Sequence, residues 1–263
     1  MKTVLTIAGS DCSGGAGIQA DLKTIAAHGL YGMSAITALT AQNTTGVSGV
    51  LEADAAFVAS QLDCIFTDIF PDAVKIGMVS SADIIGAIVE KLKQYGARNI
   101  VADPVMVSTS GSKLIDDNAK AALLAQLLPL ADVITPNIPE AEVLSGIKIA
   151  TRDDMVRAAE RMQMPCYVLI KGGHLEGIAA DMLYRDGHAV WFEGERIDTK
   201  NTHGTGCTLS SAIACGLAVG LDMETAVEGA KAYVTGALKA GLELGHGNGP
   251  LDHNWMNRWR DSK

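Results

Sequence analysis

The sequence VLTIAGSDCSGGAGIQADLKTIAAH, residues 4–28, decides the class of fold. Residues 4–8 form a short apolar, β-branched segment typical of a buried strand, and residues 18–28 have apolar side chains at helical spacing. The loop between them has glycine at positions 14, 15 and 17, and glycine lets the backbone approach a ligand closely. Because glycine is also the common turn residue, this loop alone identifies no ligand.

The same order of strand and helix repeats along the chain, and no linker-like or repetitive segment interrupts it. Further strands are expected at residues 34–39, 73–76, 100–102, 133–135 and 167–170. Helices are expected at residues 55–67, 82–94, 118–128 and 152–162. This alternation predicts an α/β fold, a three-layer αβα sandwich with a mostly parallel central sheet, as a single domain over residues 1–263.

The last third of the sequence predicts a hairpin followed by two helices. Residues 180–184 and 189–192 flank an Asp186-Gly187 pair, which favours the positive φ angles of a tight hairpin, so we expect an antiparallel edge. Residues 209–221 and 223–242 have helical patterns. The first of these helices is almost free of charge, so we expect it to be buried.

Composition limits the possible partners. The 263 residues are 48% hydrophobic and 19% charged, which suffices for one large core. Basic minus acidic residues give 21 − 30 = −9, the wrong sign for a nucleic-acid binder, so a small-molecule partner is favoured. The longest segment without Asp, Glu, Lys or Arg, residues 24–51, contains glycines and amides, so we expect no membrane span and a cytoplasmic protein. The five cysteines include no CxxC pair, which argues against disulfides and zinc.

Residues 201–208, NTHGTGCT, predict an anion site. They lead directly into the apolar helix, whose first N–H groups and positive dipole end attract anions such as phosphate. Glycine at 204 and 206 lets phosphate oxygens reach the backbone. Cys207 lies where we expect the thiol pKa to be lowered, which suits a base or nucleophile. The alternative is that an isolated cysteine is a small core residue, as we expect for the other four.

The glycine-rich loop matches neither a Walker A sequence nor a dinucleotide-binding GxGxxG, so another nucleotide-binding solution is needed. Eight motifs are LTIAGSDCSGGAGIQADLKT (5–24), ITALTAQNT (36–44), KIGM (75–78), ADPVM (102–106), ITPNIPEAE (134–142), KGGH (171–174), NTHGTGCT (201–208) and GHGNGP (245–250). In these motifs the chain resembles the ribokinase-like kinases, and within them the hydroxymethylpyrimidine/phosphomethylpyrimidine kinases of thiamine biosynthesis. The resemblance runs nearly end to end.

The resemblance implies a ribokinase-like fold and two phosphorylations with ATP and Mg²⁺. The first acts on 4-amino-5-hydroxymethyl-2-methylpyrimidine and the second on its monophosphate. The implied catalytic residues are Gly204, Thr205, Gly206 and Cys207, which form the anion hole, and Lys171. Cys207 stands where the wider superfamily has an Asp base. Most pyridoxal kinases keep that Asp, but a pyridoxine-phosphorylating subgroup also has Cys, so Cys favours the pyrimidine without excluding vitamin B6.

The resemblance also assigns the acceptor site. Gln42 matches the residue that recognises the aminopyrimidine, and a carboxamide offers a donor and an acceptor side by side to a ring nitrogen and its amino neighbour. Gly9, Met78 and Val105 match residues that lie against the ring. The alternatives are a solvent-facing glutamine at position 42 and ordinary core residues at 78 and 105.

The nucleotide and metal residues follow from the same resemblance. Lys171, Asn137, Gly172 and Thr205 match nucleotide-binding positions. Asp103 and Glu140 match residues that hold Mg²⁺ through water, which suits an ion that keeps several waters; a monovalent cation is a further candidate. Glu140 equally suits the first turn of a helix, and a lone lysine at a strand end usually faces solvent.

Three other functions compete with this prediction: a pyridoxine or pyridoxal kinase of the same fold, a hydrolase with Cys207 as nucleophile, and a non-catalytic nucleotide-binding regulator. Lys171, Asp103 and Glu140 argue against a regulator, which has no use for phosphoryl-transfer electrostatics. We also expect a homodimer. Trp255 and Trp259 lie four residues apart in a helical pattern that suits either a dimer surface or packing on its own core.

Overall fold

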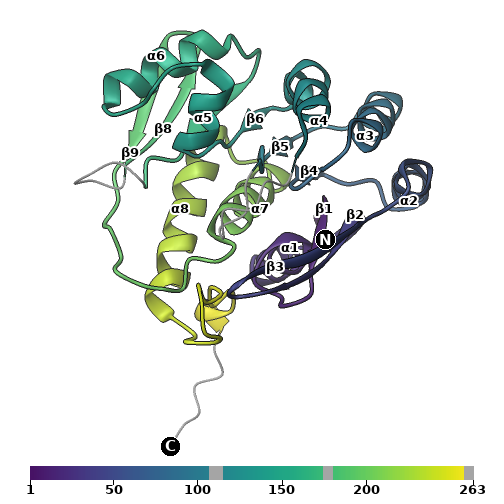
Figure 1. Cartoon of the computed structure of the whole chain (residues 1–263), viewed down its shortest axis with the longest axis horizontal. Coiled ribbons are helices and arrows are strands. Elements are labelled where there is room, and N and C mark those ends of the chain that lie inside the picture. Colours follow the sequence, from purple (N-terminus) through teal and green to yellow (C-terminus); the bar gives the residue numbers. More distant parts are fainter. Residues whose placement is uncertain (107–114, 174–179, 258–263) are drawn as a thin grey trace, which may run out of the picture.

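The computed structural model describes residues 1–106, 115–173 and 180–257, which contain a nine-stranded sheet in the order β3-β2-β1-β4-β5-β6-β7-β8-β9 (Figure 1). The strands are β1 (Thr3–Asp11), β2 (Tyr31–Asn43), β3 (Gly46–Glu52), β4 (Ala73–Ile76), β5 (Ile100–Ala102), β6 (Val133–Ile134), β7 (Tyr167–Ile170), β8 (Asp181–Arg185) and β9 (His188–Phe192). The α-helices are α1 (Gly17–Ala27), α2 (Ala55–Asp68), α3 (Ala82–Tyr95), α4 (Asp117–Ala122), α5 (Ile138–Ser145), α6 (Arg152–Met162), α7 (Thr205–Ala218) and α8 (Met223–Ala240).

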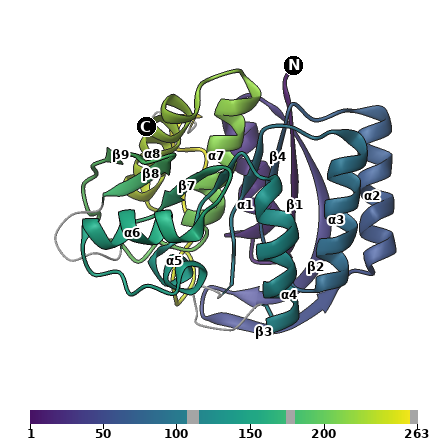
Figure 2. The same ribbon diagram turned by 90° about the horizontal axis from the view of Figure 1, so that it is seen from above.

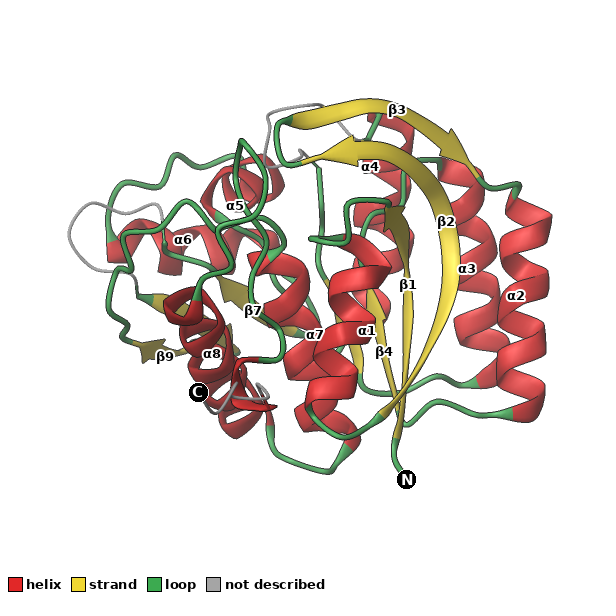
Figure 3. Cartoon of the chain, turned by 90° about the horizontal axis from the view of Figure 1, so that it is seen from below, coloured by secondary structure: helices red, strands yellow, loops and turns green. Residues whose placement is uncertain are grey.

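The six central strands of the sheet, β2, β1, β4, β5, β6 and β7, pair in parallel. Antiparallel strands lie at both edges, β3 at one and β8 with β9 at the other. The predicted α/β class, with a mostly parallel sheet and an antiparallel hairpin of β8 and β9 at its edge, is confirmed. The helices α2, α3, α4 and α6 lie on one face of the sheet, and α1, α7 and α8 lie on the other (Figures 2 and 3). Their buried apolar side chains form one core on each face. The helix expected at residues 209–221 is buried almost throughout as α7.

Three features differ from the elements expected from the sequence. β3 was not expected, because it is an edge strand with mostly exposed side chains and lacks an apolar face. α5 was not among the expected helices, because it has only eight residues and contains Pro139, although Glu140 does lie in a first helical turn, as its alternative interpretation stated. The segment expected as one helix at 118–128 changes after α4 into a π-helical turn, Leu123–Leu127, and a 3-10 turn that contains Pro129, which cannot donate a backbone hydrogen bond.

Two further observations concern the C-terminal tryptophans and membrane-spanning helices. Trp255 lies in a short 3-10 helix, Trp255–Asn257, whereas Trp259 lies outside the described residues. None of the helices formed by the described residues has the length and apolar character needed to cross a bilayer.

A buried ion pair joins four of the elements beneath the site. Lys75 on β4 donates to both carboxylate oxygens of Asp21 on α1, at 2.9 and 2.8 Å, and both side chains are 0% exposed. The same carboxylate accepts hydrogen bonds from Thr6 on β1, at 2.6 Å, and from Ser211 on α7, at 2.8 Å. Burial alone would lower the pKa of Lys75, but the Asp21 charge raises it above its ordinary value, so the amine is cationic.

The variant Asp21→Asn should lower the free energy of unfolding by about 3–5 kcal/mol, because it leaves the Lys75 ammonium group buried without a counter-charge. Urea-induced unfolding at neutral pH measures this change. The matched control is Glu195→Ala, which removes the partner of an exposed ion pair, Lys239–Glu195, and should change the midpoint little. Equal losses in the two variants would show that the buried pair has no special contribution.

Candidate active site

Polar residues gather at the carboxyl ends of the parallel strands, which is where ligands bind in open α/β sheets. Asp11 ends β1, Gln42 lies near the end of β2, Met78 follows β4, Asp103 follows β5 and Lys171 follows β7. Residues from distant parts of the chain therefore meet at one edge of the sheet.

The N-terminus of α7 is open to a ligand. Gly204 is its N-cap, with φ of +84°, and no side chain caps the first turn. A Cβ at Gly204 would lie 1.9 Å from the carbonyl oxygen of Gly15, so only glycine fits where the two glycine-rich loops meet. Thr205, Gly206 and Cys207 form the first turn, whose N–H groups suit an anion. The residues expected to form the anion hole are thus placed as a helix N-terminus requires.

Lys171 and Asp103 lie beside this helix end. A Cβ built on Gly206 would be 3.2 Å from Asp103 Oδ2 and 3.3 Å from Lys171 Nζ. Lys171 donates to Asp103 Oδ1 at 2.9 Å, and Thr135 Oγ1 donates to the same oxygen at 2.9 Å. Burial lowers the pKa of Lys171, but the Asp103 and Glu140 charges more than offset it, so the pKa is raised. A cationic lysine next to an anion-binding helix end is suited to phosphate oxygens.

Glu140 and Asn137 form a capping box at the start of α5. Asn137 Oδ1 accepts from the Glu140 N–H at 2.9 Å, and Glu140 Oε2 accepts from the Asn137 N–H at 2.8 Å. Burial raises the pKa of Glu140 to about 6. Asn137 also forms a parallel bridge with Lys171, which brings the expected nucleotide-binding residues together. Among the described residues, no group of three or more His, Cys, Asp and Glu side chains is arranged to hold a metal ion.

Gly172, the other expected nucleotide-binding residue, has a clear structural role. Its N–H donates to Asp181 Oδ1 at 2.9 Å, and a Cβ there would lie 1.8 Å from the carbonyl oxygen of Ala180. Glycine is therefore required by the close approach of the two segments.

Cys207 does not have the lowered pKa expected from its place at the helix N-terminus. Burial, together with the negative charges of Asp21 and Asp103, raises the pKa of the thiol to about 11, and the positive charge of Lys75 offsets only part of the shift. The expectation was wrong because burial and two nearby negative charges outweigh the helix dipole. The thiol is neutral in the free protein, which argues against a hydrolase with a Cys207 thiolate.

The acceptor residues expected from the sequence lie on β1 and β2 and in the segments that follow β4 and β5. A Cβ at Gly9 would be 2.7 Å from Met78 Cε, so these two residues are in direct contact. Met78 is half-buried, and its carbonyl oxygen accepts from Thr37 Oγ1 at 2.8 Å. Val105 is also half-buried and lies two residues beyond Asp103. Both side chains are thus partly accessible rather than enclosed in the core.

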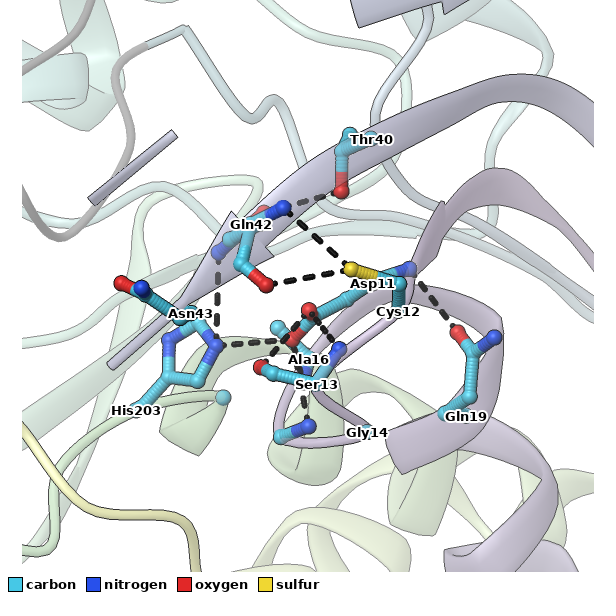
Figure 4. Close-up of polar contacts among 12 residues, drawn as sticks. Asp11, Cys12, Ser13, Gly14, Ala16, Gln19, Thr40, Gln42, Asn43 and His203 are labelled. Atoms are coloured by element: carbon cyan, nitrogen blue, oxygen red, sulfur yellow. Dashed lines mark hydrogen bonds and ion pairs between the residues drawn. The ribbon is translucent and has the colours of Figure 1, made fainter. Parts of the chain in front are cut away.

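Gln42 belongs to a hydrogen-bonded cluster that the sequence did not reveal (Figure 4). One end of its carboxamide lies 3.3 Å from His203 Nε2 and the other lies 3.2 Å from Thr40 Oγ1. His203 Nε2 lies 2.8 Å from Asp11 Oδ2. The Asp11 carboxylate also accepts from Ser13 N and Oγ, Gly15 N and Ala16 N. Burial raises the pKa of Asp11, but these hydrogen bonds, that of His203 foremost, lower it to about 2.

In the free protein, iodoacetamide at pH 7.5 should alkylate Cys12 well before Cys207. Cys12 is exposed, whereas the Cys207 thiol is partly buried and has a pKa of about 11. Peptide mass spectrometry over a time course measures both rates. Faster labelling of Cys207 than of Cys12 would show that its thiolate is accessible and stabilised.

Comparisons with known proteins identify the family of this chain. The model of the phosphomethylpyrimidine kinase family matches residues 11–252. A hydroxymethylpyrimidine/phosphomethylpyrimidine kinase of Rhizobium meliloti is 51% identical over 263 residues, which covers 98% of each chain. The structure of phosphomethylpyrimidine kinase from Clostridium difficile has a TM-score of 0.80 at 51% identity, over 89% of this chain and 98% of that one. Staphylococcus aureus pyridoxal kinase with AMP-PCP and pyridoxal has a TM-score of 0.90 at 36% identity, over 98% and 96%. The chain therefore belongs to the phosphomethylpyrimidine kinase family.

Proposed function

We propose that this protein phosphorylates 4-amino-5-hydroxymethyl-2-methylpyrimidine and then its monophosphate, with ATP as donor, to form the pyrimidine diphosphate of thiamine biosynthesis. One observation carries the proposal: the Gln42 carboxamide is linked through His203 to the open N-terminus of α7. A group able to recognise an aminopyrimidine edge thus lies next to a group able to bind a phosphate.

Lys171 and the first turn of α7 would bind the phosphoryl group during transfer. The lysine is cationic, and the N–H groups of Gly206 and Cys207 in the first turn of α7 are already in place to meet the developing charge. ATP as donor is supported by the AMP-PCP complex of the related pyridoxal kinase. A hollow of about 660 Å³ is large enough for a nucleoside, and it is lined by residues 195–199, Asn201 and residues 238–243. Asn201 lies two positions before His203 in the sequence.

Mg²⁺ would be held by Asp103 and Glu140 through water. The negative charge of Asp103 contributes to the raised pKa of Glu140, and both carboxylates lie near Lys171, so they would lie close to phosphates bound by that lysine. Mg²⁺ keeps several waters and needs few direct protein ligands, which suits a site with two acidic residues. Its chemistry there is to neutralise charge on the phosphate oxygens.

We also propose a single domain over residues 1–263, acting as a cytoplasmic homodimer. The single sheet that includes β1 to β9 supports one domain. The five free cysteines are consistent with a reducing compartment. Exposed apolar side chains on β3 and α2, at Val50, Leu51 and Phe57, offer a surface for a second copy.

A pyridoxine or pyridoxal kinase is the second candidate, because the pyridoxal kinase of Staphylococcus aureus shares the fold at a TM-score of 0.90. A substrate panel in one ATP-coupled assay tests both. We expect the highest kcat/KM for the hydroxymethylpyrimidine and its monophosphate, and lower values for pyridoxine and pyridoxal. A preference for pyridoxal would support the second candidate, and ATP binding without turnover on any acceptor would support a regulator.

The variant Gln42→Leu should raise KM for the aminopyrimidine roughly 5- to 150-fold, because the polar edge of the ring would be buried without partners, at a cost of about 1–3 kcal/mol. Leucine is similar in size, so the fold and the KM for ATP should be retained. Steady-state kinetics with each substrate varied in turn measures both constants. A near-native kcat/KM for the pyrimidine would show that Gln42 does not recognise the acceptor.

Substitutions at Cys207 should affect the two phosphorylations differently. The first acceptor is a neutral hydroxymethyl group that must lose a proton, whereas the second is a phosphate monoester already largely ionised near pH 7. The Cys207 thiolate, a minor species because burial raises the pKa of the thiol, would be the base for this proton, so Cys207→Ala should slow the first step more than the second. Cys207→Asp should harm the second step more, because two unit charges 4 Å apart repel by about 4 kcal/mol at an effective dielectric of 20. Rates for both acceptors at saturating ATP and Mg²⁺ measure this; equal losses in both variants would contradict it.

A further inference from the structure

His203 fixes which end of the Gln42 carboxamide is the acceptor. The ionised Asp11 carboxylate can only accept, so His203 Nε2, at 2.8 Å, carries the proton of their hydrogen bond. A ring nitrogen that bears a proton cannot accept another hydrogen bond. The Gln42 atom that lies 3.3 Å from it is therefore paired only if it is the oxygen Oε1.

Thr40, at the other end of the carboxamide, accommodates the same polarity. Its hydroxyl has one hydrogen and two neighbouring oxygen or nitrogen partners, and the shorter contact, 3.0 Å to the carbonyl oxygen of Ser10 against 3.2 Å to Gln42, assigns that hydrogen to Ser10. The hydroxyl oxygen then accepts from the other end of the Gln42 carboxamide, 3.2 Å away, so that end is the amide nitrogen. With its nitrogen toward His203, as in Figure 4, the carboxamide sets two N–H groups against each other; turned end over end, it pairs both of its ends.

The groups that impose this polarity are rigidly held. Asp11 is 3% exposed and His203 is 6% exposed. Four donors besides His203 hold the Asp11 carboxylate, and the His203 backbone N–H donates to the carbonyl oxygen of Gly249 at 3.0 Å. A buried donor in a fixed position makes the reversed carboxamide costly, because the reversal leaves a buried hydrogen bond unmade.

We propose that His203 is a positioning residue that sets the polarity of Gln42 and thereby the orientation of the acceptor ring. The inference rests on the proposed function. The second lone pair of Oε1 accepts from the amino group of the ring on the His203 side, and the second N–H of Nε2 donates to the ring nitrogen on the Thr40 side. The geometry thus assigns a different neighbour to each edge of the ring.

This orientation directs the acceptor hydroxyl to the site of transfer. The hydroxymethyl group is attached to the ring carbon next to the one that bears the amino group, so it also lies on the His203 side. His203 immediately precedes Gly204, the N-cap of α7. A reversed Gln42 would bind the ring turned over, with the hydroxymethyl group directed away from the anion hole.

The test compares two acceptors in the full-length protein: the 4-amino compound and its 4-oxo analogue, whose edge has the opposite pattern of donor and acceptor. In the unchanged protein, kcat/KM should strongly favour the amino compound. In His203→Leu, which lets Gln42 reverse, the amino-to-oxo ratio of kcat/KM should fall at least about tenfold. His203→Gln keeps an N–H toward Asp11 and should retain most of the ratio. A merely structural role would lower both efficiencies and leave the ratio unchanged.

Two further variants keep the test decisive. Thr40→Val is isosteric and removes the acceptor at the other end of Gln42, so it should also lower the ratio even if His203→Leu does not fold. His188→Leu replaces an exposed histidine on β9 and should leave the ratio unchanged. An unchanged amino-to-oxo ratio of kcat/KM in the folded His203→Leu and Thr40→Val variants would overturn the inference about His203 and leave the proposed function standing. Failure of the unchanged protein to phosphorylate the amino compound would overturn the proposed function and the inference together.

Discussion

Lys75 and Asp21 form an ion pair without solvent exposure on either side chain, at the point where α1 and α7 pack on the sheet. Because Thr6 and Ser211 bond to the same carboxylate, β1, β4, α1 and α7 are joined through one group. Removing one partner of such a pair is costly, because it leaves the other charge buried and unpaired. Here Ser211 joins α7 to the pair, and the positive charge of Lys75 lies near enough to Cys207, in the first turn of α7, to act on its thiol.

The same charges explain why a thiol is suited to position 207. The carboxylates of Asp21 and Asp103 raise the pKa of Cys207, and they would equally oppose the charge of any acidic side chain in its place. Lys75 and Lys171 already have buried acidic partners. A neutral side chain therefore leaves the positive end of α7 available to phosphate oxygens, without adding a negative charge to the site.

The sequence predicted what depends on local pattern and missed what depends on distant contacts. The parallel strands are continuous apolar segments, so their positions in the sequence and the α/β class could be predicted, but exposed β3 and eight-residue α5 lack such a signal. The glycines of 204–207 marked the helix N-terminus, yet burial, which raises the pKa of Cys207, is set by tertiary packing. The contact between Asp11 and His203 joins residues 192 positions apart, so no local sequence pattern could predict it.

The GHGNGP segment, residues 245–250, provides a backbone link between the same two loops that His203 joins through its side chain. The Asn248 N–H donates to the carbonyl oxygen of Thr44, and the Gly249 carbonyl oxygen accepts from the His203 N–H, each at 3.0 Å. A Cβ at Gly247 would lie 2.1 Å from the Thr44 carbonyl oxygen, so the close approach requires glycine. The spacing between the Gln42 segment and the anion hole is thus fixed by hydrogen bonds between main-chain groups. The His203 side chain is left to determine the polarity of Gln42 rather than the distance between the loops.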